Sequence, residues 1–382
     1  MKHSSLKPIE RSYWTSPVRK QHRIVASPSK QNESSEHQVG GTTVAYSLQL
    51  EAQYATPTQR TRPVVLPGDP EPLLAYEMIK GNLVRFSSPE STASRPPPTA
   101  VLVHGVLGSK RNMHSFANKL VRGYPHWQVL LVDLRCHGDS AEITPALRNQ
   151  SHSVESAADD VLKLLQALKL FPEVLIGHSF GGKVVMSMAH QFGSGIKRLP
   201  RPVQVWVLDA LPGDVRSVAT GSMDGPEHLI KALKSTPLPI KNRCELVNFL
   251  EERRFSHGIA AWAATNLTPL DNGMGLTWRV DLEGIDRMYR SYATTNLWPL
   301  LEHPADGIEV SFVRAERSSF RWSGEDQDLI QAYGHRVHLL RNSGHWVHAD
   351  NPDGLFDIIS SNSFGTPDIH MQRSPGSPSS LN

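Results

Sequence analysis

The stretch that most constrains this chain reads Leu175-Ile176-Gly177-His178-Ser179-Phe180-Gly181-Gly182-Lys183 and contains the pattern Gly-x-Ser-x-Gly. The apolar run 173–176 precedes it, and the helix-like run 183–189 follows it. A serine between two glycines on a sharp strand-to-helix turn is typical of a nucleophile elbow, because so tight a turn leaves no room for side chains beside it. The next helix would point its positive N-terminal end at developing negative charge. We therefore expect Ser179 to be a nucleophile.

A second turn comes earlier in the chain. Residues 101–109 form an apolar strand that runs into the Gly-containing turn His104-Gly105-Val106-Leu107-Gly108. A strand-ending turn of this kind can supply one backbone N–H to an oxyanion hole. Because the oxyanion exists only in the transition state, its donors must already be in place. We expect the amides of Val106 and Phe180 to be these donors.

A candidate base lies near the C-terminus, in Asn342-Ser343-Gly344-His345-Trp346-Val347-His348. His345 follows the short apolar strand 337–340 and precedes a helix-like segment at 352–359. A general base must reach the serine without crowding, which a loop at the carboxyl edge of a sheet allows. His345 is favoured because it is the first histidine of the loop, and His348 is its competitor.

The acid that would orient this histidine stays open. Asp209 ends the apolar run 203–208, and Glu316 ends the run 310–315, the commoner place for such an acid. The loop after Glu316 has no aspartate where one usually stands. Asp209 is preferred, Glu316 is the alternative, and Asp281 and Glu283 are further candidates.

Taken together, these motifs resemble the α/β-hydrolase superfamily, and within it the branch of small acyl esterases that includes bacterial esterases and a mitochondrial abhydrolase-domain protein. The resemblance covers about residues 72–362 and implies a metal-free Ser-His-Asp mechanism. In that branch the acid stands at the end of the strand after the elbow helix, which supports Asp209. The resemblance rests on four segments: 104–109 (HGVLGS), 133–140 (DLRCHGDS), 177–183 (GHSFGGK) and 344–350 (GHWVHAD).

The stretch Asp133–Ser140 holds Asp, Arg, Cys and His in a row, residue types that also serve as metal ligands and nucleophiles. We interpret it as a strand end and turn with a structural role. The histidines are scattered, and neither HExxH nor CxxC spacing occurs, so no metal is expected. No glycine-rich nucleotide motif follows a strand, so no cofactor is expected either.

Apart from its ends, the chain alternates strand and helix, which predicts an α/β fold with a mostly parallel sheet. An antiparallel hairpin is expected from 73–79 and 82–86. Parallel strands are expected at about 100–104, 128–133, 174–177, 203–209, 308–313 and 336–340. The helical spacing of apolar residues in Ser153–Leu168 predicts a helix packed on this sheet.

The insert at about 211–301 interrupts this alternation before the penultimate strand. Its helix-like segments predict a helical cap over the mouth of the site. Apolar residues of this cap are candidates for an acyl pocket, although most are expected to form the core of the cap itself. These candidates are Trp262, Trp278, Met288, Tyr289 and Trp298.

The two ends differ in composition from the predicted hydrolase domain at 71–362. Residues 1–70 are polar and are expected to be disordered. Their first thirty residues are basic, Ser-rich and poor in acids, as in an organellar transit peptide. Ile24-Val25-Ala26-Ser27 resembles a plastid processing site, so a chloroplast is expected, with the mitochondrion or cytoplasm as alternatives. Residues 363–382 are Pro/Ser-rich and predict a disordered tail.

The remaining composition excludes several function classes. The net charge is +3 and no basic face carries interleaved aromatic residues, so nucleic acid is not an expected partner. No apolar run is long enough for a transmembrane helix. The expected function is hydrolysis of a lipid-like or small hydrophobic carboxylic ester. The alternatives are a ligand-sensing or protein-protecting protein of the same fold, and lyase, C–C hydrolase or acyltransferase chemistry.

Overall fold

A seven-stranded sheet forms the centre of the protein. The computed structural model describes residues 74–84, 96–143, 151–193, 203–216, 225–318, 320 and 322–363. Only the first strand is antiparallel, so the predicted mostly parallel α/β sheet is confirmed. In spatial order the strands are β1 (Tyr76–Lys80), β3 (Gln128–Val132), β2 (Thr99–Val103), β4 (Val174–His178), β5 (Val203–Leu208), β8 (Ile308–Ala315) and β9 (Arg336–Leu340).

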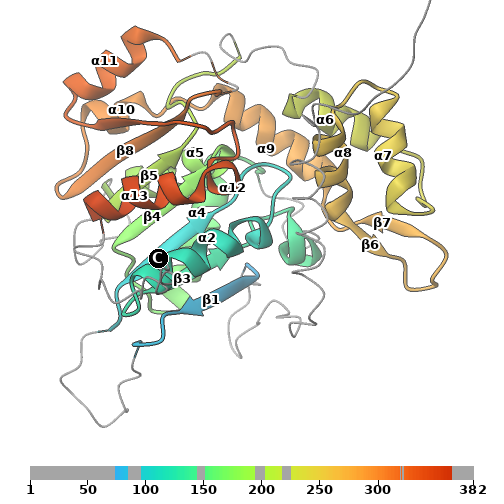
Figure 1. Ribbon diagram of the computed structural model, residues 1–382, viewed down its shortest axis with the longest axis horizontal. Helices are drawn as coiled ribbons and strands as arrows, with labels where there is room; N and C mark the ends of the chain where they lie inside the picture. Colours follow the sequence, from blue (N-terminus) through green and yellow to red (C-terminus); the bar gives the residue numbers. More distant parts are fainter. Residues whose placement is uncertain are drawn as a thin grey trace, which may run out of the picture. The chain divides into compact units, whose positions relative to one another are not determined.

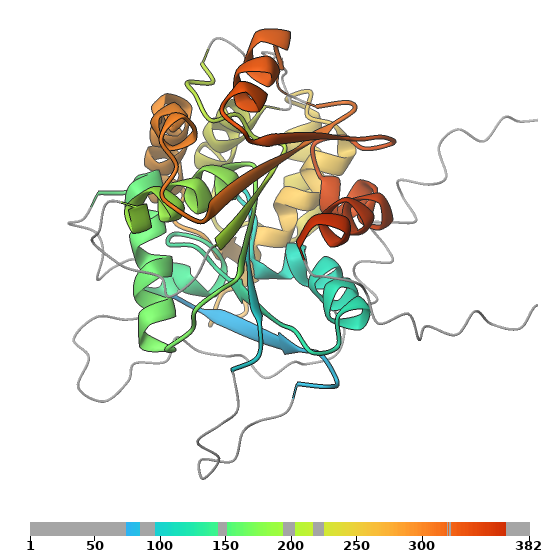
Figure 2. The same cartoon turned by 90° about the vertical axis from the view of Figure 1, so that its left-hand side faces the viewer.

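Helices cover both faces of this sheet, as Figure 2 shows along its edge. On one face lie α2 (Lys110–Gly123), α12 (Val347–Asp350) and α13 (Pro352–Ser363). On the other lie α4 (Val154–Ala167) and α5 (Phe180–Gly193). Every residue of β2, β3 and β4 is buried, in keeping with their mostly apolar sequences and with helices on both faces of the sheet. Two shorter helices lie in the connections between strands: η1 (Gly138–Ile143) follows β3, and α11 (Gly324–Ala332) lies between β8 and β9.

A cap is inserted between β5 and β8, before the penultimate strand as the sequence predicts. Figure 1 shows its helices beside the sheet, with α9 leading back toward α5. The predicted helices are present, and a small hairpin joins them. The elements are α6 (Pro226–Lys234), α7 (Arg243–Glu251), α8 (His257–Ala263), η2 (Ala264–Asn266), β6 (Leu267–Pro269), β7 (Leu276–Trp278), α9 (Leu282–Thr294) and α10 (Trp298–Glu302).

The N-terminal hairpin expected from 73–79 and 82–86 is wrong. Strand β1 pairs antiparallel with β3, and residues 82–84 form a turn instead of a second strand. Gly81 and Leu83 donate their N–H groups to Trp127 O and Pro125 O, both at 2.9 Å. These bonds draw the chain onto the turn before β3. The predicted disordered segment 1–70, the transit peptide within it and all but the first residue of the tail 363–382 lie outside the described residues.

Candidate active site

Ser179 occupies a sharp turn between β4 and α5. Its φ of 52° lies in the left-handed region, which is costly for a non-glycine residue and is common at functional sites. A Cβ on Gly177 would lie 2.0 Å from Gly181 O, and a Cβ on Gly181 would lie 2.4 Å from Val103 O. Both glycines are therefore required by close backbone approach, which is the physical basis of the Gly-x-Ser-x-Gly pattern.

Asp209 and His345 meet at the carboxyl edge of the sheet. Asp209 directly follows β5, and its side chain is fully buried. Its Oδ2 lies 2.8 Å from His345 Nδ1, while its Oδ1 accepts the Ala315 N–H at 3.1 Å. The carboxylate is thus held in place by β8 and directed at one ring nitrogen of His345. The geometry therefore unites the preferred acid with the preferred base.

The competing acids lie elsewhere. Glu316 is exposed, and its carboxylate accepts the Asn342 N–H at 2.9 Å. Asp281 caps the N-terminus of α9, and Glu283 forms an exposed ion pair with Lys234 at 3.0 Å. None of these contacts involves His345.

The competing histidine, His348, is buried beside His178, with their ring centroids 4.8 Å apart. Its Nδ1 has no hydrogen-bond partner among the described residues. Burial lowers the pKa of His348 to about 4, so the ring is neutral at pH 7. Without a carboxylate to orient it, His348 fits the role of a buried packing residue.

His178, the neighbour of the serine, supports the loop that carries His345. Its Nε2 donates to the His345 carbonyl at 2.7 Å, and the two ring centroids are 4.7 Å apart. Burial holds the pKa of His178 well below its ordinary value, so it is a neutral donor here. The elbow thereby holds the candidate base as well as the candidate nucleophile.

The turn expected to supply oxyanion donors lies directly against the elbow. Residues 105–108 form a turn closed by the Gly108 N–H donating to Gly105 O at 3.0 Å. A Cβ on Gly105 would lie 3.3 Å from Ser179 Cβ, so the two backbones are in close contact. Val106 is the second residue of the turn, and Phe180 opens α5, where amides have no partner within the helix. Both candidate donors therefore belong to segments that border the serine.

Side chains from outside the turn brace it. Leu107 has a φ of 59°, and its N–H donates to His137 Nε2 at 3.0 Å. Asn266, from the cap, donates to Leu107 O at 2.9 Å and is buried. Burial lowers the pKa of His137 to about 3, which keeps the ring neutral and able to accept. The cap therefore helps to fix the backbone beside the candidate nucleophile, a role with no signature in the sequence.

The stretch Asp133–Ser140 makes the structural contacts expected of it. The Asp133 carboxylate accepts both the backbone N–H and the ammonium of Lys110 at 2.6 Å. Arg135 forms two bonds of 2.6 Å to the Asp160 carboxylate. These pairs tie the loop after β3 to α2 and α4.

Tyr292 of α9 was not singled out by the sequence. Its ring packs on Phe180, with centroids 5.8 Å apart. Its hydroxyl is buried and lies beside the Ser179 hydroxyl. Burial raises the pKa of Tyr292 far above its ordinary value, and the nearby Ser179 hydroxyl opposes part of this shift. A buried phenol thus faces the candidate nucleophile, although in sequence it is one aromatic residue of a cap helix.

Lys183, in the first turn of α5, joins the elbow helix to the cap. Its fully buried ammonium donates to Gly213 O, Tyr292 O and Thr295 O at 2.6, 2.7 and 2.8 Å. It also lies 4.7 Å from the centre of the Tyr292 ring. Burial lowers the pKa of Lys183 to about 7, but three simultaneous donations require the protonated amine. Lys183 therefore fixes the position of Tyr292 over the elbow.

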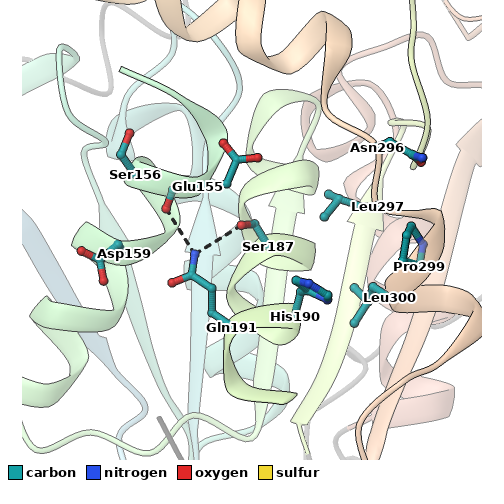
Figure 3. A pocket seen from close by; sticks show the side chains of 10 residues that line it. All are labelled: Glu155, Ser156, Asp159, Ser187, His190, Gln191, Asn296, Leu297, Pro299 and Leu300. Carbon is teal, nitrogen blue, oxygen red and sulfur yellow. Dashed lines mark hydrogen bonds between the residues drawn. The ribbon is translucent and has the colours of Figure 1, made fainter. Parts of the chain in front are cut away.

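A separate pocket lies on the outer surface between α4, α5 and α10 (Figure 3). Gln191 crosses it, donating to Glu155 O and Ser187 Oγ at 3.2 and 3.4 Å. None of the candidate catalytic residues lines this pocket, so the site is defined by the elbow and not by this cavity.

Comparison with known proteins identifies the family of the chain. Residues 100–358 match the profile of the family described as "Alpha/beta hydrolase family". A mouse protein named "sn-1-specific diacylglycerol lipase ABHD11" is 30% identical over 270 residues, which cover 69% of this chain and 80% of the relative. "Esterase YbfF" of Escherichia coli is 23% identical over 261 residues, 68% of this chain and 90% of that protein.

Solved structures show the same fold. One titled "Marine microorganism esterase" superimposes with a TM-score of 0.57 at 22% identity, covering 76% of this chain and 98% of the other. No helix among the described residues is long and apolar enough to cross a lipid bilayer. The family match extends from β2 into α13 and includes the elbow at Ser179. The chain therefore belongs to the α/β-hydrolase family.

Proposed function

We propose that this protein hydrolyses carboxylic esters, with Ser179 as nucleophile, His345 as base and Asp209 as the acid that orients it. The observation that carries the proposal is the 2.8 Å contact between buried Asp209 and His345. Ser179 lies on a strained turn whose neighbouring residue, His178, holds the His345 loop. The names of the relatives, which include esterases and a lipase, support an ester as substrate.

The proposed reaction has two halves. His345 Nε2 takes the Ser179 proton as Oγ attacks the ester carbonyl, and the resulting oxyanion is held by the amides of Val106 and Phe180. His345 then gives that proton to the departing alcohol. Water attacks the acyl-enzyme with His345 again acting as base, and the acid is released as Ser179 regains its proton. Asp209 keeps the imidazole in the tautomer that leaves Nε2 free to accept.

We infer that Tyr292 is a third group that contacts the substrate. Its buried hydroxyl faces Ser179, so it would also lie close to the oxygen of an ester bound at Ser179. A hydrogen bond from this hydroxyl to the developing oxyanion would form only in the transition state and would therefore raise kcat.

The proposed substrate is a lipid-like or small hydrophobic ester with an apolar acyl group. Trp262 packs on Trp346, beside His345, with ring centroids 5.6 Å apart. Of the other aromatic candidates, Tyr289 stacks on Tyr292 with centroids 5.9 Å apart. Met288 is fully buried in the core that the cap shares with the sheet.

The proposal is tested by fluorophosphonate labelling and by turnover of p-nitrophenyl esters of increasing acyl length. Wild type should label and turn over many times, and Ser179→Ala should do neither. A folded wild-type protein that binds ester but neither labels nor turns over would overturn the hydrolase proposal in favour of a ligand-sensing protein. Product analysis separates hydrolysis from acyl transfer or C–C cleavage.

Import into an organelle stays a prediction, based on the basic N-terminal segment. A fluorescent protein fused behind residues 1–70 would test it directly. Import into chloroplasts or mitochondria would support the prediction, and diffuse cytoplasmic fluorescence would contradict it.

A further inference from the structure

We propose that Cys136, His152 and Asp281 form a site for a divalent transition metal, best suited to Zn²⁺, that ties the cap to the body of the protein. One ligand atom from each of these residues lies within 4.8 Å of both others. The site uses none of the residues assigned to ester hydrolysis, so the inference stands independently of the proposed function. It departs from the expectation of no metal, which rested on the absence of any local ligand spacing.

The three ligands come from segments far apart in the sequence. Cys136 lies in the loop after β3, His152 directly precedes the N-cap of α4, and Asp281 is the N-cap of α9 in the cap. The Asp281 N–H donates to Cys136 O at 2.9 Å, and the Val154 N–H donates to Ser291 Oγ at 3.1 Å. These bonds hold the three segments in register before any ion binds.

Two of the ligand atoms already have the spacing that a tetrahedral ion requires. Cys136 Sγ and His152 Nδ1 are 3.5 Å apart. Zinc bonds of about 2.3 Å to sulfur and about 2.0–2.1 Å to nitrogen, at a tetrahedral angle, place these two ligands about 3.6 Å apart. Thiolate and imidazole are the donors that favour Zn²⁺ over harder ions such as Mg²⁺ or Ca²⁺.

Asp281 presents its second oxygen toward the same space. Its Oδ1 accepts the N–H groups of Glu283 and Gly284 at 3.1 Å, which anchors the carboxylate. A Cβ on Gly284 would lie 2.3 Å from Cys136 Sγ and 3.0 Å from Asp281 Oδ2. Glycine at this helical position therefore allows the sulfur and the free carboxylate oxygen to converge.

The charges of the site also suit a dication. A thiolate and a carboxylate together offset the charge of Zn²⁺, so the occupied site is neutral. The His152 imidazole binds as a neutral ligand and adds no charge to the site. Arg135 is already paired with Asp160, and Arg287 is exposed, so neither leaves a buried excess of positive charge.

Burial defines where a fourth ligand would enter. Cys136 is 0% and His152 5% exposed, whereas Asp281 is partly exposed. Water would complete the coordination from the Asp281 side.

Co²⁺ titration of the metal-stripped full chain tests the proposal, because a tetrahedral Co²⁺–thiolate site has an intense charge-transfer band and visible d–d bands. The chain has 18 histidines and 2 cysteines. Binding of zinc alone would therefore not identify the site, whereas the Co²⁺–thiolate band requires a cysteine ligand. We expect the band to saturate at one Co²⁺ per chain and to disappear when Zn²⁺ is added. It should be lost in Cys136→Ser and kept in Cys244→Ser, since Cys244 is exposed on α7.

Thermal unfolding gives a second measurement that needs no cysteine variant. Zn²⁺ at a hundred times its Kd should raise the Tm of wild type by roughly 5 °C, reversibly with chelator, and His152→Gln should abolish the rise. Absence of a Co²⁺–thiolate band in wild type would overturn the proposal. A band that survives in folded Cys136→Ser, or that disappears in Cys244→Ser, would overturn it as well.

Discussion

Replacing Asp209 by asparagine tests the proposed triad most sharply, because the change removes one charge and almost no volume. Asp209 accepts two hydrogen bonds, from the Ala315 N–H at 3.1 Å and from His345 Nδ1 at 2.8 Å. In Asp209→Asn the amide oxygen can keep the Ala315 N–H, which leaves the NH₂ group facing His345. Since that NH₂ is only a donor, Nδ1 must then be an acceptor and the proton moves to Nε2.

A ring protonated at Nε2 cannot take the proton of Ser179. We therefore expect kcat for p-nitrophenyl esters to fall by about 10⁴-fold, or roughly 5 kcal/mol of transition-state stabilisation, the magnitude known for such a substitution in serine proteases. KM should change little, because Asp209 is buried behind the histidine. The free energy of unfolding should change by no more than about 1–3 kcal/mol, since the Ala315 bond is retained.

Glu316→Gln is the matched control, because Glu316 is the alternative acid. It is exposed and bonds to the Asn342 N–H, which glutamine can also bond through its oxygen. Its kcat should stay within a few-fold of wild type. A Glu316→Gln enzyme as impaired as Asp209→Asn, or an Asp209→Asn enzyme within tenfold of wild type, would refute the assignment.

Three further predictions follow from the same geometry. His345→Ala should abolish fluorophosphonate labelling while His348→Phe labels normally, and loss of labelling in both folded variants would contradict the choice between them. Tyr292→Phe should lower kcat by about ten- to a hundredfold with little change in KM, because only the hydroxyl is removed; Tyr289→Phe is its control, and equal losses would argue for a packing effect. Burial lowers the pKa of His104 and of His348 to about 4, so the folded chain keeps both neutral while the unfolded chain protonates them below about pH 6.5. Each should therefore destabilise the fold by about 1.4 kcal/mol per pH unit from 6.5 down to 4, or about 2 kcal/mol at pH 5. Urea unfolding at pH 7 and pH 5 measures this loss, and His348→Phe should lack its own share.

Local sequence determined the elbow and most of the sheet. The tight turn at Ser179 needs glycine at 177 and 181 whatever surrounds it, because their Cβ atoms would overlap backbone atoms of neighbouring segments. The parallel strands can also be predicted from sequence, since strands buried on both faces are mostly apolar. These features depend on a few adjacent residues, so one sequence is enough to predict them.

Other features were decided only by tertiary structure. Sequence left Asp209 and Glu316 as rival acids, because each ends an apolar strand, and only the packing of β5 against β8 places Asp209 beside His345. It also suggested a hairpin where β1 instead pairs with β3, since pairing partners are set by which edge of the sheet is free.

The cap and the proposed metal site depend most on the fold. Tyr292 faces Ser179, and Asn266 holds the turn at Leu107, across separations of more than a hundred residues. Cys136, His152 and Asp281 likewise converge from three segments with no shared spacing. Turns and strands are specified by neighbours along the chain, whereas a site assembled from distant side chains exists only once packing has brought them together.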